Sequence, residues 1–194
     1  MSFLIAGFIQ LMIPSGTLQL IRIEQSFGFV SILLLYVALL ASPLTKVFPS
    51  PSFKDGYIHA RRAIGVMAFY YAFLHTYLTF YKQLNGLTGI QYYNSKYSLS
   101  LLLGTIGLGI LLILTITSLD WAVYTLRFKN WKLIHRLVYI AGLTILLHIV
   151  IIGPHYVGLG FVSALSYVGV AILLLLEAIR IRLSYLNRKK VARK

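Results

Sequence analysis

Charged residues and cysteine are scarce in this 194-residue chain. Only 11% of its residues are charged, whereas a soluble domain carries roughly a quarter. Hydrophobic residues make up 59% of the chain, and its mean hydropathy is +0.83. This composition excludes an ordinary water-soluble domain and places the chain in a bilayer. The complete lack of cysteine excludes disulfides, thiolate metal sites and cysteine nucleophiles.

Acidic residues are scarcer still, with four against 18 Lys and Arg and a net charge of +14. They are Glu24, Asp55, Asp120 and Glu177, and none falls deep within an apolar run. A proton-coupled transporter normally needs a membrane-embedded carboxylate or a histidine relay. A zinc or di-metal site in a bundle needs carboxylates or closely spaced His and Glu. The sequence therefore disfavours both, and we expect Glu177 to form a local ion pair with Arg180.

The sequence instead contains a series of long apolar runs. Crossing the hydrocarbon takes about 20 mostly apolar residues, and six runs approach this length: residues 3–21, 27–45, 62–81, 98–119, 133–153 and 158–179. The first run lacks the features of a signal peptide, so we expect a helix there too. We therefore predict an all-α integral membrane protein, a six-transmembrane-helix bundle forming one domain over residues 1–194. The connections leave no room for a flavin or nicotinamide domain.

The basic residues indicate the orientation of the bundle. Fifteen of the 18 lie in the connection between runs two and three, in that between runs four and five, or in the C-terminal tail. The positive-inside rule places these regions, and with them both termini, in the cytoplasm. We expect the basic tail to bind anionic lipid headgroups rather than nucleic acid.

Three of the five histidines fall in the apolar runs. His75 lies deep in the third run and His148 deep in the fifth, which His135 opens. His75 follows Arg62, and His148 follows His135, by about 20 Å of helix, so we expect the two histidines at similar depth in the outer half of the membrane. One histidine on an apolar helix is usually structural. Two at matching depth suit the axial positions of a six-coordinate b-type haem.

Helix geometry adds a condition to this interpretation. His135 and His148 lie about 140° apart around a straight helix, so they face one groove only if the helix bends, which we expect Gly142 to permit. His59 and His155 fall in connections, where we expect them to be solvated. The fourth run carries three glycines that favour close helix packing: Gly104, Gly107 and Gly109.

Two strings resemble the ferric-reductase-like transmembrane superfamily: RRAIGVMAFYYAFLH (61–75) and TSLDWAVYTLRFKNWKLIHRLVYIAGLTILLH (117–148). The first has Arg-Arg, a glycine three residues later and a histidine ten after that. The second has Thr-Ser, then Trp-x-x-x-His-Arg-Leu-Val-Tyr, and a histidine thirteen residues after the first. Ser42-Pro43-Leu44 is similar to the family's Thr-Pro-Leu. The resemblance covers about residues 27–153 and is strongest to the haem-binding membrane subunit of the bacterial periplasmic methionine-sulfoxide reductase system.

This resemblance implies a set of haem-binding residues. His75 and His148 would bind the iron of haem b, and His135 would be a further haem-associated histidine. A second haem remains open, because Arg61 stands where two-haem relatives have another histidine. That haem would use His135 alone or with His59 or an arginine. Three arginines suit haem propionates or a flavin phosphate, and equally suit the positive-inside rule alone: Arg61, Arg62 and Arg136.

The function that the resemblance implies is transmembrane electron transfer in the bacterial inner membrane. It also implies a cytoplasmic flavin reductase, with FMN, or a membrane quinol as donor, and a periplasmic molybdenum-containing reductase as acceptor. The chain would then be an electron-transfer subunit rather than the catalytic one. Two alternatives stay open: a stand-alone ferric or other metal reductase, and a cofactor-free transporter or structural subunit of a membrane complex.

Overall fold

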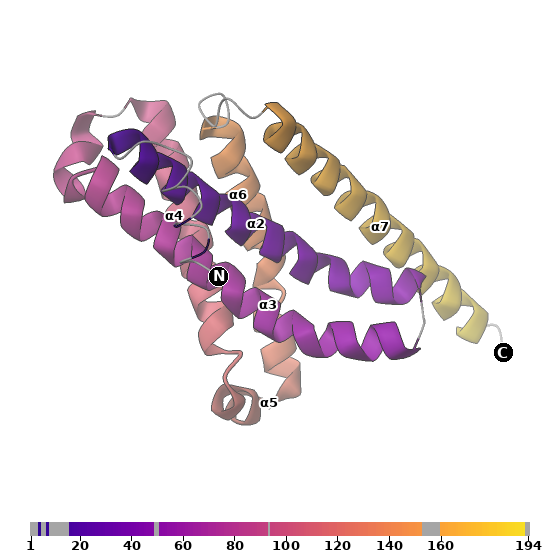
Figure 1. Ribbon diagram of the computed structural model, residues 1–194. Coiled ribbons are helices and arrows are strands. Elements are labelled where there is room, and N and C mark those ends of the chain that lie inside the picture. Colours follow the sequence, from indigo (N-terminus) through magenta and orange to yellow (C-terminus); the bar gives the residue numbers. More distant parts are fainter. Residues whose placement is uncertain are drawn as a thin grey trace.

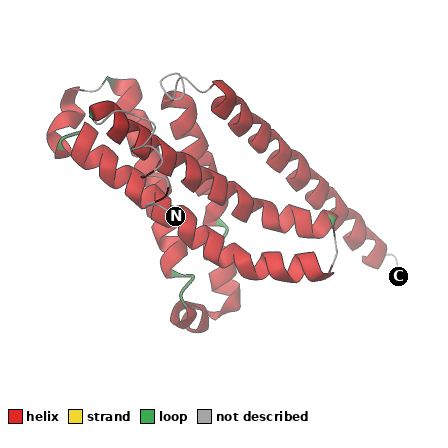
Figure 2. Cartoon of the chain, in the orientation of Figure 1, coloured by secondary structure: helices red, strands yellow, loops and turns green. Residues whose placement is uncertain are grey.

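The computed structural model describes residues 4, 7, 16–48, 51–92, 94–152 and 160–192, and all regular structure among these residues is helical (Figures 1 and 2). The all-α prediction is therefore confirmed for this part of the chain. The elements, in chain order, are α2 (Thr17–Val47), α3 (Pro51–Leu78), the π-helix η1 (Thr79–Gln83), the 3-10 helix η2 (Gly86–Tyr92), α4 (Ser95–Ile116), α5 (Asp120–Ile134), α6 (Leu137–Ile152) and α7 (Gly160–Ala192).

The helices make this a multi-pass membrane protein. Within the described ranges, three segments are long and apolar enough to cross a bilayer: Gln19–Val47, Asp55–Gln83 and Ser95–Ile116. Helices α5 and α6 add a fourth if they form one span bent by 46°. The run at 3–21 lies largely outside the described residues. Six spans and cytoplasmic termini therefore stay predictions.

The start of the second predicted span was wrong. Helix α2 begins at Thr17 rather than near residue 27, because the polar stretch that resembles a connection is helical. The polar side chains of this stretch are hydrogen-bonded or buried in the helix. The Ser26 hydroxyl donates to the Arg22 carbonyl at 2.8 Å, and Glu24 is only 5% exposed. Glu24 therefore lies inside a membrane helix, which contradicts its predicted place outside the spans.

The connection between the fourth and fifth predicted spans contains a helix of its own, α5. His135 and Arg136 lie at the break between α5 and α6, and α6 starts at Leu137. The 46° bend lies at this break and not at Gly142, which lies within α6 and would place an added Cβ 3.4 Å from Leu39. Helix α5 has its own kink at Arg127, where φ is 57°.

The core forms where two helix pairs meet. Helix α2 runs beside α3, α4 packs against α6, and α2 also contacts α6 and α7 (Figure 1). One buried polar contact joins the first pair, because the Ser31 hydroxyl donates to the Ala68 carbonyl at 2.8 Å. The buried apolar residues of this core come from α2, α3, α4 and α6: Leu35, Leu39, Ala68, Leu111, Leu114 and Ala141.

Two of the three α4 glycines permit the close approach of α6. A Cβ at Gly107 would lie 2.7 Å from Ile145 Cγ1, and one at Gly104 would lie 3.0 Å from His148 Nδ1. A Cβ at Gly109 would meet nothing within 4 Å. The packing prediction is therefore confirmed at Gly104 and Gly107 and wrong at Gly109.

Candidate functional site

The structure brings His75 of α3 and His148 of α6 together. Their ring centroids are 6.4 Å apart and their ring planes meet at 75°. The two residues are 73 positions apart in the chain, so only the packing of the bundle makes them neighbours. This pair is the centre of the candidate site.

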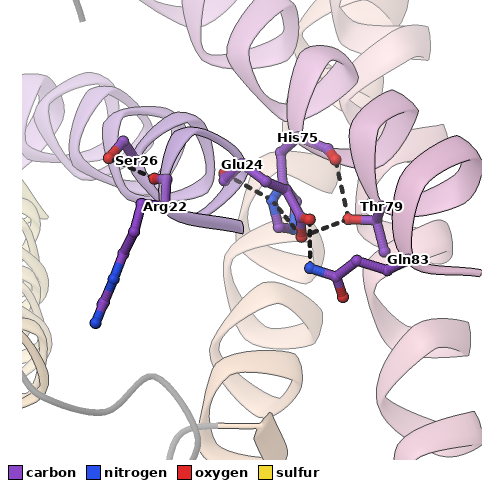
Figure 3. Close-up of polar contacts among 6 residues, drawn as sticks. All are labelled: Arg22, Glu24, Ser26, His75, Thr79 and Gln83. Carbon is purple, nitrogen blue, oxygen red and sulfur yellow. Dashed lines mark hydrogen bonds and ion pairs between the residues drawn. The ribbon is translucent and has the colours of Figure 1, made fainter. Parts of the chain in front are cut away.

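A backbone carbonyl fixes the tautomer of His75. Its Nδ1 lies 3.1 Å from the carbonyl oxygen of Glu24 on α2 (Figure 3). A carbonyl oxygen only accepts hydrogen bonds, so Nδ1 must carry the proton and donate it. Nε2 then keeps its lone pair, and no described residue forms a hydrogen bond with it. His75 therefore has one nitrogen free to bind a metal.

His148 is held in the same way from α4. Its Nδ1 lies 2.8 Å from the backbone carbonyl oxygen of Ser100, so this Nδ1 is also the donor. The Ser100 hydroxyl donates in return to the His148 carbonyl at 3.0 Å, and Ser100 is fully buried. Gly104, one turn further along α4, leaves the room that the ring occupies. His148 therefore also keeps Nε2 for a ligand.

The spacing of the two rings fits one metal ion between them. Two imidazoles on opposite sides of an ion have ring centres about 6.2 Å apart, because each metal–nitrogen bond is about 2.0 Å and each nitrogen lies about 1.1 Å from its ring centre. The observed separation is 6.4 Å. Metal-binding histidines commonly donate their second N–H to a carbonyl or carboxylate, as both do here. Two histidines are the ligand set of a six-coordinate b-type haem, and within the described residues no group of three or more His, Cys, Asp or Glu could hold a metal ion.

The sequence analysis missed Glu24 as a neighbour of this pair. Its carboxyl Oε1 lies 3.7 Å from His75 Nδ1 and 2.7 Å from the Thr79 hydroxyl, and its Oε2 accepts a hydrogen bond from Gln83 (Figure 3). In the sequence Glu24 stands in a polar stretch, so no apolar pattern marks it as buried. Only the packing of α2 against α3 brings this carboxyl group to the histidine.

A second group of predicted site residues lines a cavity of about 970 Å³. It lies at the level of Arg61 and Arg62, about 20 Å along α3 from His75. Pockets of this size and mixed character hold cofactor-sized ligands, and the basic side chains suit an anionic one. Its apolar lining includes Leu35, Ala38, Val66, Leu111, Leu114 and Val138, and its basic lining is Arg61, Arg62, Lys132, His135, Arg136 and Arg180.

The charges in this cavity are only partly balanced. Arg62 pairs with Asp120 at 2.7 Å, and Arg180 pairs with Glu177, as predicted for the latter pair. Arg61 instead donates to the Ser42 hydroxyl at 3.1 Å. Within the described ranges no acidic side chain pairs with Arg61 or Arg136, so the cavity keeps a positive charge.

His135 has no histidine partner among the described residues that line this cavity. Its ring packs against Trp131 with centroids 4.1 Å apart, and its Nε2 lies 3.3 Å from the Thr117 hydroxyl. His59 is exposed and is not among the lining residues. His155 lies outside the described residues. The structure thus brings His135 together with the three predicted arginines but not with His59.

Comparisons with known proteins agree with the resemblance noted from the sequence. The protein-methionine-sulfoxide reductase heme-binding subunit MsrQ of Brucella anthropi is 28% identical over 120 residues, which cover 61% of this chain and 51% of the relative. The protein of the same name from Brucella ovis is 37% identical over 83 residues, which cover 42% and 36%. The chain thus matches about half or less of the length of these relatives. Residues 27–146 match the ferric reductase like transmembrane component, and the chain belongs to this family.

Proposed function

We propose that this protein is a haem b-containing membrane subunit that transfers electrons across the bacterial inner membrane. The observation that carries this proposal is the His75–His148 pair, with ring centroids 6.4 Å apart and each Nδ1 held by a backbone carbonyl. The names of the Brucella relatives support haem binding and a partnership with a methionine-sulfoxide reductase. We propose a periplasmic, molybdenum-containing reductase of this type as the electron acceptor.

The residues of the pair would hold the iron and fix its environment. His75 and His148 would bind it through Nε2, and the carbonyls of Glu24 and Ser100 would keep both rings in one orientation. When bound, haem supplies a one-electron iron couple. Two histidine ligands leave no open coordination position, which suits electron transfer better than oxygen activation.

The cavity around His135 would serve the donor side. Arg61 and Arg136 carry charge that no described acidic side chain balances, so they would bind an anionic group such as a haem propionate or a flavin phosphate. Arg62 lies beside them and shares its charge with Asp120. A cytoplasmic flavin reductase with FMN, or a membrane quinol, would deliver electrons at this end.

A reduced-minus-oxidised visible spectrum of the detergent-purified chain tests the proposal, with haem counted per chain. We expect a low-spin b-type signal that disappears in His75→Ala and in His148→Ala. His135→Ala is the matched control, because its ring lines the cavity near Arg61 and Arg62 rather than the His75–His148 pair, and it should keep this signal. A folded wild-type chain made with haem available but containing none would refute the proposal.

A reductase assay separates the electron-transfer subunit from a stand-alone metal reductase. Membranes that contain the chain and a donor, but no periplasmic partner, should not reduce an external ferric chelate. Reduction that is lost in His75→Ala would favour the metal reductase.

A further inference from the structure

Glu24 is the one acidic side chain that is buried within the described part of the chain, with 5% of its surface exposed. It lies in the membrane-spanning segment of α2, where an acidic residue is costly and commonly has a function. Neither the sequence motifs nor the family resemblance assigns it a role.

Three side chains of one helix face meet this carboxyl group. His75, Thr79 and Gln83 follow one another at intervals of four residues along α3 and η1. The π-helical turn is closed by a hydrogen bond from the Leu84 N–H to the Thr79 carbonyl at 2.9 Å. Figure 3 shows Thr79 and Gln83 on the side of the helix that faces Glu24. Such π-helical turns are frequent at functional sites.

The contacts of Glu24 reach His75 and the two residues that follow it on this helix face. Its backbone carbonyl accepts from His75 Nδ1 at 3.1 Å, and its Oε1 lies 3.7 Å from the same nitrogen. The Thr79 hydroxyl lies 2.7 Å from Oε1 and 2.9 Å from the His75 carbonyl oxygen. Gln83 donates to the other carboxyl oxygen. The side chain of Glu24 is therefore tied to the same turn of helix that carries the histidine.

We infer that Glu24 is a positioning residue for His75: its backbone carbonyl accepts the Nδ1–H of the ring, and its carboxyl group, held by Thr79 and Gln83, keeps that carbonyl in place against the ring. This inference rests on the proposed haem site. A carbonyl that accepts the second N–H of a metal-binding histidine sets the ring orientation and tautomer, and disturbing such a partner typically lowers metal affinity by about 10–100-fold.

Three variants of the full chain test this role, with haem affinity and the electron paramagnetic resonance of the ferric protein as readouts. The resonance is the decisive readout because it depends on the angle between the two imidazole planes, which is 75° here. Glu24→Ala removes the carboxyl group, and Glu24→Gln keeps its length and an oxygen acceptor. Ser31→Ala is the matched control, because it removes another buried bond between α2 and α3 away from His75.

We expect wild-type protein to give the strongly anisotropic low-spin signal of nearly perpendicular imidazoles. Glu24→Ala should shift this signal and lower haem affinity by about 10-fold. Glu24→Gln should restore part of the signal and part of the affinity, and Ser31→Ala should keep the wild-type signal and affinity. If Glu24→Ala does not fold, Thr79→Val decides in its place, because it removes the hydroxyl that holds Oε1 and should shift the same signal.

Two results would overturn the inference while leaving the proposed function intact. One is a wild-type signal and affinity in folded Glu24→Ala, or in Thr79→Val where that variant decides. The other is an equal change in Ser31→Ala, which would reduce Glu24 to a contact between helices. Wild-type protein without haem would overturn the proposed function and this inference together.

Discussion

Gly104, which packs against the ring of His148, offers a quantitative test of the site. In Gly104→Ala the new Cβ would lie 3.0 Å from Nδ1 and 3.1 Å from Cε1 of His148, whereas ordinary contacts begin at 3.4 Å. The ring would have to move by about 0.4 Å, and its hydrogen bond to the Ser100 carbonyl, 2.8 Å long, opposes that movement. Overpacking of this kind costs about 1–3 kcal/mol.

Gly109→Ala is the matched control on the same helix, because its Cβ would meet nothing within 4 Å. Each substitution also raises the free energy of unfolding by about 0.5–1 kcal/mol, because alanine loses less backbone freedom than glycine when it folds into a helix. This gain cancels when the two variants are compared. The free energy of unfolding of Gly104→Ala should therefore be about 1–3 kcal/mol below that of Gly109→Ala.

The assay is reversible unfolding in mixed detergent micelles, followed by helical circular dichroism, together with haem counted per chain. We expect Gly104→Ala to lose both stability and haem relative to Gly109→Ala. Equal stability and equal haem content in the two variants would refute the close packing of α4 on the His148 ring and, with it, the site geometry.

Two further predictions concern the cavity around His135 and the topology. Trp131→Phe keeps an aromatic ring beside His135 but loses the hydrogen bond from the indole N–H to the Thr117 carbonyl, which is 2.9 Å long. This variant should lower the free energy of unfolding by about 1 kcal/mol and leave the b-type spectrum unchanged. Loss of the spectrum would contradict the separation of the His135 cavity from the His75–His148 pair. Tyr92→Cys and Tyr124→Cys each introduce a single thiol, at positions 83% and 85% exposed, in a chain without cysteine. A membrane-impermeant maleimide should label Tyr92→Cys from outside intact cells and Tyr124→Cys only after lysis. The reverse labelling pattern would contradict the predicted orientation.

The apolar runs and the spacing of the histidines were enough to predict the class of the protein and its central pair. Runs of about 20 apolar residues indicate bilayer-spanning helices, because only a helix satisfies every backbone polar group within a single segment there. The equal offsets of His75 and His148 from the basic ends of their runs predicted similar depth, since helical rise is constant. Depth along an axis follows from residue number alone.

Packing between the helices sets which side chains meet around those histidines. Glu24 stands in a polar stretch of the sequence, yet packing of α2 against α3 buries it beside His75. Ser100 and Gly104 hold His148 only because α4 packs closely on α6. Rotation of each helix about its axis, and the bend at His135, depend on contacts between distant segments. Local patterns of hydropathy and charge carry no record of those contacts, which is why the histidine pair could be predicted but not the residues that orient it.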